Sequence, residues 1–273
     1  MRLPNESELT TETARALYQW DLRECFATDP RHWWTIHYRN RLDKILKTMS
    51  DFVPVGGQIL DIGCAQATAA LMLAERGFRV TAVDANQESL DYAQLRHESG
   101  DINFVCMDAM KLSLKGPFDA ILLGEVIEHV PRPGTLLREC VEMLRPNGII
   151  VVTTPNGRSL HNWRLPPYDE SMEVEERADV PSGIGVGDGA LAKLEPNPLH
   201  LFCFRRRQLS EVAVKCGLTL EHSELLNSYV VNPIQLHKIL PLKITKWLNQ
   251  ICSQIPVLAD FTTMALFVVG KKN

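Results

Sequence analysis

The segment Glu125-Val126-Ile127-Glu128-His129 places two carboxylates and an imidazole within five residues, directly after the apolar run from Phe118 to Leu123. Such side chains can act as general acids and bases. If the chain turns helical here, the spacing i, i+3, i+4 puts all three groups on one face. A structural interpretation competes, because acids near a helix start also stabilise its dipole while His129 orients a neighbour.

Three more acids, Asp61, Asp84 and Asp108, each sit at or beside the carboxyl end of an apolar run that predicts a strand. The carboxyl ends of parallel strands meet at one edge of a sheet, so we expect these acids to converge there. A lone acid after a strand is often a helix cap, and for Asp108 that interpretation stays open.

The stretch 58–86 has the order strand, tight turn, helix, strand. The first strand ends in Asp61-Ile62-Gly63, a helical pattern follows, Gly77 closes it, and the second strand ends on Asp84. Such a βαβ unit predicts a site for an adenosine-bearing ligand. The first turn lets backbone approach the ligand, and the second acid accepts hydrogen bonds from ribose hydroxyls.

Strands alternate with helices along the chain, which predicts an α/β fold with a mostly parallel sheet covered on both faces. We expect an N-terminal helical cap at 1–52 and a cofactor-binding α/β core at 53–157. Residues 158–200 lose periodicity and predict a substrate-lid insertion. Residues 201–273 are expected to complete the same α/β domain.

Composition narrows the functional classes. The chain has 273 residues, 45% of them hydrophobic, and a net charge of -4, which argues against a nucleic-acid partner. The basic cluster Arg205-Arg206-Arg207 is too short to follow many phosphates and predicts a solvated helix start. Seven cysteines without a CxxC pair fit a reducing cytoplasm. No apolar run is long enough to span a bilayer, and the oligomeric state is not indicated.

The motif Asp61-Ile62-Gly63-Cys64-Ala65-Gln66-Ala67, followed by Asp84, Asp108 and Arg145-Pro146-Asn147-Gly148-Ile149, resembles the ordered motifs of class I S-adenosylmethionine-dependent methyltransferases. The resemblance implies a Rossmann-like seven-stranded sheet with an antiparallel last strand. The first turn would lie against the methionine part of the cofactor, Asp84 on the ribose and Asp108 near the adenine amino group. The residues that the resemblance places at the cofactor are Asp61, Gly63, Ala65, Asp84, Ala85, Met107, Asp108, Ala109 and Glu125.

The chain departs from the family pattern acid-x-Gly-x-Gly-x-Gly at Ala65 and Ala67. Each alanine adds a methyl group and disfavours positive φ, so the departure motivates an alternative, a non-catalytic cofactor-binding protein. A nicotinamide-dependent oxidoreductase is a further alternative, but of G-x-G-x-x-G only Gly63 would remain.

The pairing of E-x-x-E-H with the later His200-Leu201-Phe202 is similar to the ubiquinone-biosynthesis O-methyltransferases and the small-RNA 2′-O-methyltransferases. That similarity implies a divalent metal, Mg, Mn, Fe or Zn, held by Glu125, Glu128, His129 and His200. Glu128 and His129 are the expected catalytic residues. In a metal-free version, His129 deprotonates the acceptor and His200 orients it.

The predicted function is therefore methyl transfer from S-adenosylmethionine to a hydroxyl of a small molecule such as a diol, catechol or sugar. Methylation at nitrogen or carbon, or of an RNA end, stays open. Aromatic residues of the insertion (His161, Trp163, Tyr168) could contact substrate or pack the insertion onto the domain. Tyr38 and Arg39, in the N-terminal helices, are further candidates for ligand contact.

Overall fold

Seven strands form one sheet in a computed structural model of the chain, which describes residues 1–27, 33–159, 167–173, 200–228, 243–244, 247–248, 251, 255 and 263–273. The strand order is β3-β2-β1-β4-β5-β7-β6. The strands are β1 (Gln58–Ile62), β2 (Arg79–Asp84), β3 (Asp101–Cys106), β4 (Phe118–Gly124), β5 (Leu144–Pro155), β6 (Leu218–Ser228) and β7 (Thr263–Lys272).

Strands β1 to β5 run parallel to one another, whereas β7 is antiparallel to both β5 and β6. The mostly parallel sheet and its antiparallel last strand confirm the expected fold. From β1 the chain continues to β2 and β3 on one side and returns to β4 on the other. The carboxyl ends of β1 and β4 therefore form a topological switch point, where open α/β sheets bind ligands.

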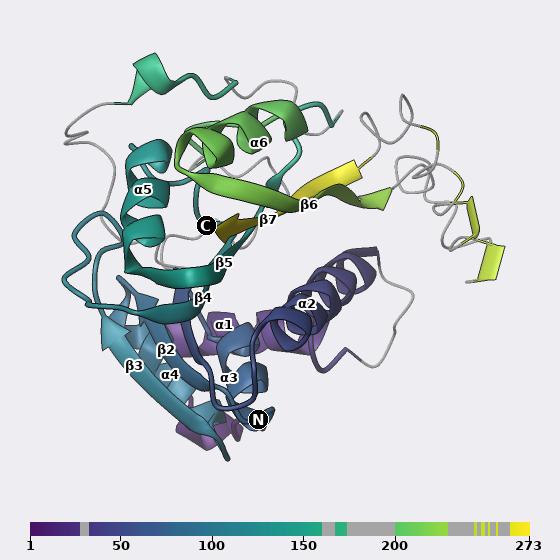
Figure 1. Ribbon diagram of the computed structural model, residues 1–273. Coiled ribbons are helices and arrows are strands. Elements are labelled where there is room, and N and C mark those ends of the chain that lie inside the picture. The colour runs from purple at the N-terminus through teal and green to yellow at the C-terminus, as the bar shows by residue number, and fades with distance from the viewer. Residues whose placement is uncertain are drawn as a thin grey trace.

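Helices cover both faces of the sheet (Figure 1). They are α1 (Glu12–Arg23), α2 (Trp33–Phe52), α3 (Thr68–Glu75), α4 (Gln87–Arg96), α5 (Pro133–Met143) and α6 (Arg206–Lys215), with short 3-10 helices η1 (Glu6–Glu8) and η2 (Glu170–Met172). Apolar residues of α2 and α3 pack on one face of the sheet, and those of α5 and α6 pack on the other. Arg205, Arg206 and Arg207 are exposed where α6 begins, as expected of a solvated helix start.

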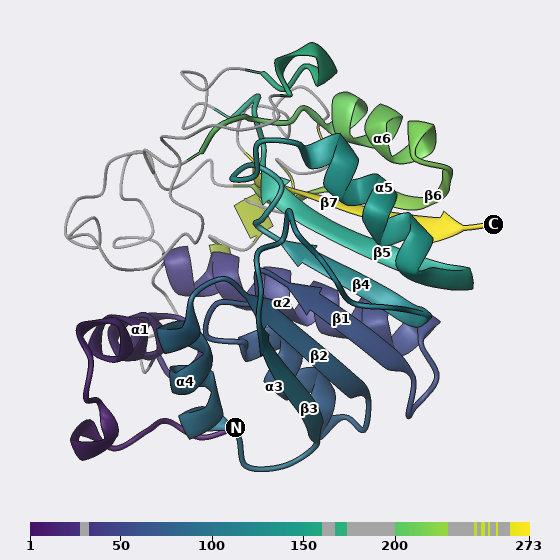
Figure 2. The same ribbon diagram turned by 90° about the vertical axis from the view of Figure 1, so that its left-hand side faces the viewer.

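Helix α1 lies against α4 (Figure 2). Leu17 of α1 and Tyr92 of α4 are both buried in a small apolar cluster between them. The N-terminal helices thus pack on the α/β core, α1 against α4 and α2 against α3.

The segment from Glu125 to His129 does not form the helix on which the shared-face interpretation depended. Glu125 has a φ of +60°, a left-handed conformation that cannot continue a right-handed helix. The segment is a turn, closed by a hydrogen bond from the His129 N–H to the Val126 carbonyl (2.9 Å).

Two predicted regions lie largely outside the described residues. Of the expected insertion at 158–200, the structure describes only 158–159, 167–173 and 200, so His161 and Trp163 fall outside it. The sequence between 234 and 251 predicts one or two further helices, and that segment also lies mostly outside the described residues. The division of the chain at 52, 157 and 200 stays a prediction. Within the described ranges, no helix is long and apolar enough to cross a bilayer.

Candidate functional site

Residues 63–67 connect β1 to α3 and are called the β1 turn here. Gly63 has a φ of +69°, and a Cβ built on it would lie 2.6 Å from Cγ2 of Val126. The positive φ and the close approach of Val126 both require glycine. A side chain would strain the backbone at this φ, and a Cβ atom would clash with Val126. Val126 belongs to the turn after β4, so Gly63 packs the two turns directly against each other.

Ala65 and Ala67 adopt the left-handed conformation that glycine would favour, with φ values of +47° and +54°. A left-handed alanine costs about 1–2 kcal/mol. The turn therefore keeps a glycine-like backbone path despite the two methyl groups. The conformational objection that motivated a non-catalytic protein is thus weakened.

Asp84 holds the β1 turn in place. Its carboxylate accepts hydrogen bonds from the Ala65 N–H (2.8 Å) and the Asn86 N–H (2.9 Å). Asn86 in turn caps α4, as its side chain accepts the Ser89 N–H. Burial raises the pKa of Asp84. Asp84 therefore stabilises the β1 turn by accepting its backbone hydrogen bond, in addition to its expected role as the ribose-binding acid.

Asp61 lies buried beneath the same turn. Burial is the main cause that raises the pKa of its carboxyl to about 8, with repulsion from Asp84 next, while the Ala70 N–H opposes the shift. The Ala70 amide belongs to the first turn of α3, which has no side-chain cap of its own. Asp61 thus satisfies an amide at the start of that helix.

The residues expected at the adenosine half lie together at the ends of β2 and β3. Asp84 pairs in register with Cys106, and its carbonyl accepts the Met107 N–H (2.9 Å). Ala85 and Ala109 flank these positions. The Asp108 carboxylate accepts the Met110 N–H (2.9 Å) and so forms a local turn. Among the described residues, no helix begins between β3 and β4, so Asp108 is not the helix cap of the alternative interpretation.

A cavity of about 330 Å³ lies at the switch point between β1 and β4. One wall comes from the β1 turn and the end of β4, and the other comes from α1 and α2. Trp20, Tyr38 and Arg41 line it from the helices, whereas none of the residues expected at the adenine does. Its size suits a small ligand group, and its position is the one expected for the methionine part of the cofactor.

Arg41 and Glu125 form an ion pair on the wall of this cavity, 3.0 Å from Nη1 to Oε2. The left-handed φ of Glu125 turns its side chain toward α2. Glu125 is consequently paired with Arg41 and is not among the side chains that gather around Glu128. Glu125 was expected either at the cofactor or as a metal ligand. Its position on the wall of this cavity favours the cofactor role.

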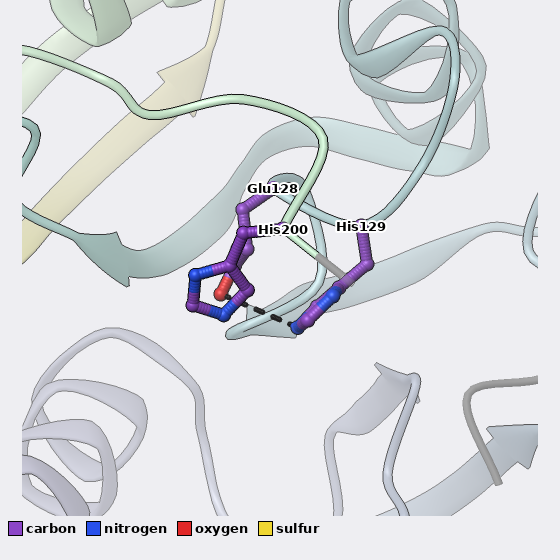
Figure 3. Close-up of side chains that lie close together, drawn as sticks. All are labelled: Glu128, His129 and His200. Carbon is purple, nitrogen blue, oxygen red and sulfur yellow. Dashed lines mark ion pairs between the residues drawn. The ribbon is translucent and has the colours of Figure 1, made fainter. Parts of the chain in front are cut away.

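Glu128 and His129, in the turn after β4, come together with His200 (Figure 3). One potential ligand atom from each lies within 4.8 Å of the others. His129 Nε2 is 3.8 Å from Oε1 of Glu128, and the two imidazole rings meet edge to face with their centroids 4.7 Å apart. Three of the four expected metal ligands therefore converge, although His200 lies 71 residues after His129 in the sequence.

Glu128 is fully buried. Its Oε2 accepts a hydrogen bond from Thr154 Oγ1 (3.0 Å), while Oε1 has no hydrogen-bond partner among the described residues. Burial first, and then Glu125, raises the pKa of the Glu128 carboxyl well above its usual range. Burial also lowers the pKa of His200 to about 4. A buried carboxylate oxygen without a partner, facing two imidazoles, is a donor set that fits a divalent cation.

The backbone holds His200 in this position. The next residue, Leu201, donates its N–H to the Glu128 carbonyl (2.7 Å). Tyr168 packs on Phe202 and Phe204 and donates a hydrogen bond to Glu173. Tyr168 is buried, so it has the packing role and not the substrate-contact role considered from the sequence.

Arg41 was missed from the sequence, although it lies in line with Tyr38, Leu42 and Ile45 on one face of α2. A charge within an otherwise apolar face was the available signal. Arg39, which was considered as a ligand contact, points elsewhere. It donates to the carbonyls of Glu24, Cys25 and Ala27 and so fixes the end of α1.

Residues 60–152 match the family described as a methyltransferase domain. The fold and this match confirm the resemblance to S-adenosylmethionine-dependent methyltransferases for that part of the chain. Among curated proteins, the ubiquinone biosynthesis O-methyltransferase of Caulobacter vibrioides is 42% identical over 105 residues, which are 37% of this chain and 42% of the relative. The chain spans about half the length, 42 to 57%, of the curated relatives considered.

Solved structures share the fold over nearly the whole chain. A chain of the Haloferax volcanii complex between the Trm112 methyltransferase activator and a methyltransferase has a TM-score of 0.59, at 16% identity, covering 95% of this chain and 97% of its own. The N-methyltransferase NodS from Bradyrhizobium japonicum, in complex with S-adenosyl-l-homocysteine, has a TM-score of 0.54 at 16% identity, covering 98% and 95%.

Proposed function

We propose that the protein is an enzyme that transfers a methyl group from S-adenosylmethionine to a hydroxyl of a small molecule, such as a diol, catechol or sugar. The observation that carries the proposal is the arrangement around one short segment, Gly124 to His129. Its first residues line the cavity beside the β1 turn, and its last two lie against His200. A methyl donor and an acceptor hydroxyl could thus be held on either side of it.

The cofactor assignment is supported by charge as well as by fold. The amino acid end of S-adenosylmethionine carries a carboxylate and an ammonium group. Arg41 and Glu125 offer the two complementary charges side by side on the cavity wall. Asp84 lies at the end of β2 for the ribose. NAD has no aminocarboxylate, so this pair favours S-adenosylmethionine over a nicotinamide cofactor.

The transfer itself needs alignment and removal of one proton. The acceptor oxygen attacks the methyl carbon in line, the carbon–sulfur bond breaks, and its electron pair stays on sulfur as the neutral thioether. The hydroxyl proton passes to a base, for which the His129 imidazole is placed beside Glu128. His200, kept neutral near pH 7 by its lowered pKa of about 4, can orient the acceptor.

A divalent cation fits the Glu128, His129 and His200 side chains, and we propose these three as its ligands. When bound, such an ion would lower the pKa of the acceptor hydroxyl and fix its position. Glu125 is left to the cofactor, since it is paired with Arg41. The alternative without metal uses His129 as base, and chelation distinguishes the two.

Incubation with S-adenosylmethionine and a panel of catechols, vicinal diols and sugars tests the proposal, with S-adenosylhomocysteine and methylated product measured by mass spectrometry. Product methylated on oxygen supports the proposed O-methylation. Product methylated only on nitrogen or carbon favours an N- or C-methyltransferase instead. Binding without turnover on any acceptor favours a non-catalytic protein. Filter binding of RNA at rising salt tests an RNA-end substrate, since a steep loss of affinity would oppose the small-molecule acceptor. We place the enzyme in the cytoplasm.

A further inference from the structure

Arg96, the last residue of α4, is fully buried, and so is Asp21 of α1. Arg96 Nε lies 2.9 Å from Oδ2 of Asp21, which also accepts a hydrogen bond from the Tyr92 hydroxyl (2.7 Å). Buried arginines are rare and need partners for their donors. Asp21 supplies the opposite charge, so α1 and α4 are joined by a buried ion pair.

The other end of the guanidinium reaches the β1 turn. Arg96 Nη1 donates to the Gln66 carbonyl (2.6 Å) and to Thr68 Oγ1 (2.9 Å). These two residues flank Ala67, which is fully buried and has a φ of +54°. The guanidinium therefore binds the chain on both sides of a left-handed alanine.

The two left-handed alanines of the turn are held from different elements. The Asp84 carboxylate at the end of β2 holds the N–H of Ala65, and Arg96 holds the residues on either side of Ala67. Ala67 is the N-cap of α3 and supplies no side-chain cap. Its left-handed conformation thus depends on groups outside the turn, where a glycine would adopt it freely.

We infer that Arg96 is a positioning residue that fixes the left-handed β1 turn and, through it, the affinity for the cofactor. Arg96 does not line the cavity, whereas Gln66 and Thr68, which it holds, do. Trp20 of α1 also lines the cavity, one residue before Asp21. The same buried pair therefore positions the β1 turn and helix α1, which both line the cavity. The cofactor part of this inference rests on the proposed function.

A double-mutant cycle between Arg96→Lys and Ala67→Gly tests the inference, with calorimetric titration of S-adenosylhomocysteine as the readout. Lysine keeps the charge but has a single nitrogen in place of the planar guanidinium, whose Nε faces Asp21 while its Nη1 binds both Gln66 and Thr68. We expect Arg96→Lys to weaken binding roughly tenfold. In the Arg96→Lys protein, Ala67→Gly should restore most of the lost affinity for S-adenosylhomocysteine. In the wild type, Ala67→Gly should change that affinity less. Equal effects of glycine in both backgrounds would overturn the inference, as would unchanged binding by Arg96→Lys.

Ala74→Gly serves as the matched control, because Ala74 lies at the other end of α3, is buried and has no contact with Arg96 among those described. It should rescue nothing. If Arg96→Lys fails to fold, Thr68→Val replaces it in the cycle, since it removes only the hydroxyl acceptor. Loss of binding that glycine restores supports the inference. Loss that glycine does not restore indicates a direct ligand contact of Thr68 and opposes it.

Urea unfolding of the four proteins of the Arg96→Lys and Ala67→Gly cycle (wild type, both single variants and the double variant) tests this inference independently of the proposed function. If the wild type binds neither S-adenosylmethionine nor S-adenosylhomocysteine, the proposed cofactor is wrong. The turn is still tested, because Ala67→Gly should raise the unfolding midpoint of Arg96→Lys more than that of the wild type. Equal shifts would then reject the role of Arg96.

Discussion

Arg41 and Glu125 face each other across 3.0 Å on the cavity wall, one from α2 and the other from the turn after β4. The second carboxylate oxygen of Glu125, Oε1, is buried and has no hydrogen-bond partner among the described residues. A ligand ammonium group could satisfy that oxygen, and a ligand carboxylate could share the guanidinium. The pair is therefore suited to bind the amino acid end of the proposed cofactor.

Arg41→Ala should weaken S-adenosylhomocysteine binding by about ten- to a hundredfold, the effect of losing hydrogen bonds to a charged group. Calorimetric titration measures it. 5′-Methylthioadenosine lacks the amino acid end, so its affinity should not change. Lys47→Ala is the control, because Lys47 is on the same helix but pairs with Asp51 at the surface. An equal loss for both ligands would show that Arg41 supports the fold and not the aminocarboxylate.

Gly63→Ala should disrupt both the turn and the site, because the new Cβ would lie 2.6 Å from Val126 Cγ2 at a φ of +69°. We expect a loss of about 2–5 kcal/mol in the free energy of unfolding, from left-handed strain plus overpacking. Gly56→Ala has similar strain, with a φ of +81°, but nothing within 4 Å of its Cβ. It should lose only about 1–2 kcal/mol.

Adding Val126→Ala to Gly63→Ala tests the contact itself. The double variant should recover part of the loss relative to Gly63→Ala, and urea denaturation measures the recovery. No recovery would mean that backbone strain alone requires glycine at this position.

The fold followed from local patterns of the sequence. The Asp61-Ile62-Gly63 turn and the acid at the end of β2 are near in sequence to the strands that they follow, so hydrophobic periodicity and turn residues located them. Two helix starts are just as local, since Asn86 caps α4 and Pro133 is the first residue of α5. Such features depend on interactions within a few residues.

The site was predicted less completely, because its decisive contacts are long-range or depend on one dihedral angle. Glu125 has a φ of +60° and pairs with Arg41 in place of joining His129 and His200, and residue type alone does not predict a left-handed glutamate. Arg41 and Arg96 act on residues far away in sequence. His200 was assigned by resemblance, and the structure brings it to Glu128 and His129.

Asp61→Asn should change how stability depends on pH. The carboxyl has a pKa of about 8 in the folded protein and near 4 when unfolded. Below pH 4 both states are protonated and the full stability is present. As pH rises from about 4 to 8, only the unfolded state loses its proton, so stability falls through that window. Asparagine has no proton to lose, so this decline should disappear.

Urea denaturation of wild type and Asp61→Asn at pH 5 and pH 8 measures the effect. The variant should be more stable relative to wild type at pH 8 than at pH 5. Asp51→Asn is the control, because Asp51 is exposed on α2. A pH dependence that is unchanged by Asp61→Asn would assign the titration to another carboxyl, of which Asp84 is the nearest candidate.

Metal content provides the test of the Glu128, His129 and His200 group. Glu128→Gln keeps the volume and the hydrogen bond from Thr154 but removes the charge, and His200→Asn removes one imidazole. Each should lower Mn²⁺ or Zn²⁺ affinity at least about tenfold, as measured by calorimetry and by elemental analysis of the purified protein. His97→Asn, at the end of α4, is the matched control and should change nothing.

Chelation should abolish methyl transfer to a hydroxyl while leaving S-adenosylhomocysteine binding intact. Should turnover survive both chelation and Glu128→Gln, His129 would be left as a general base without metal, and the rate should then rise with pH to a plateau.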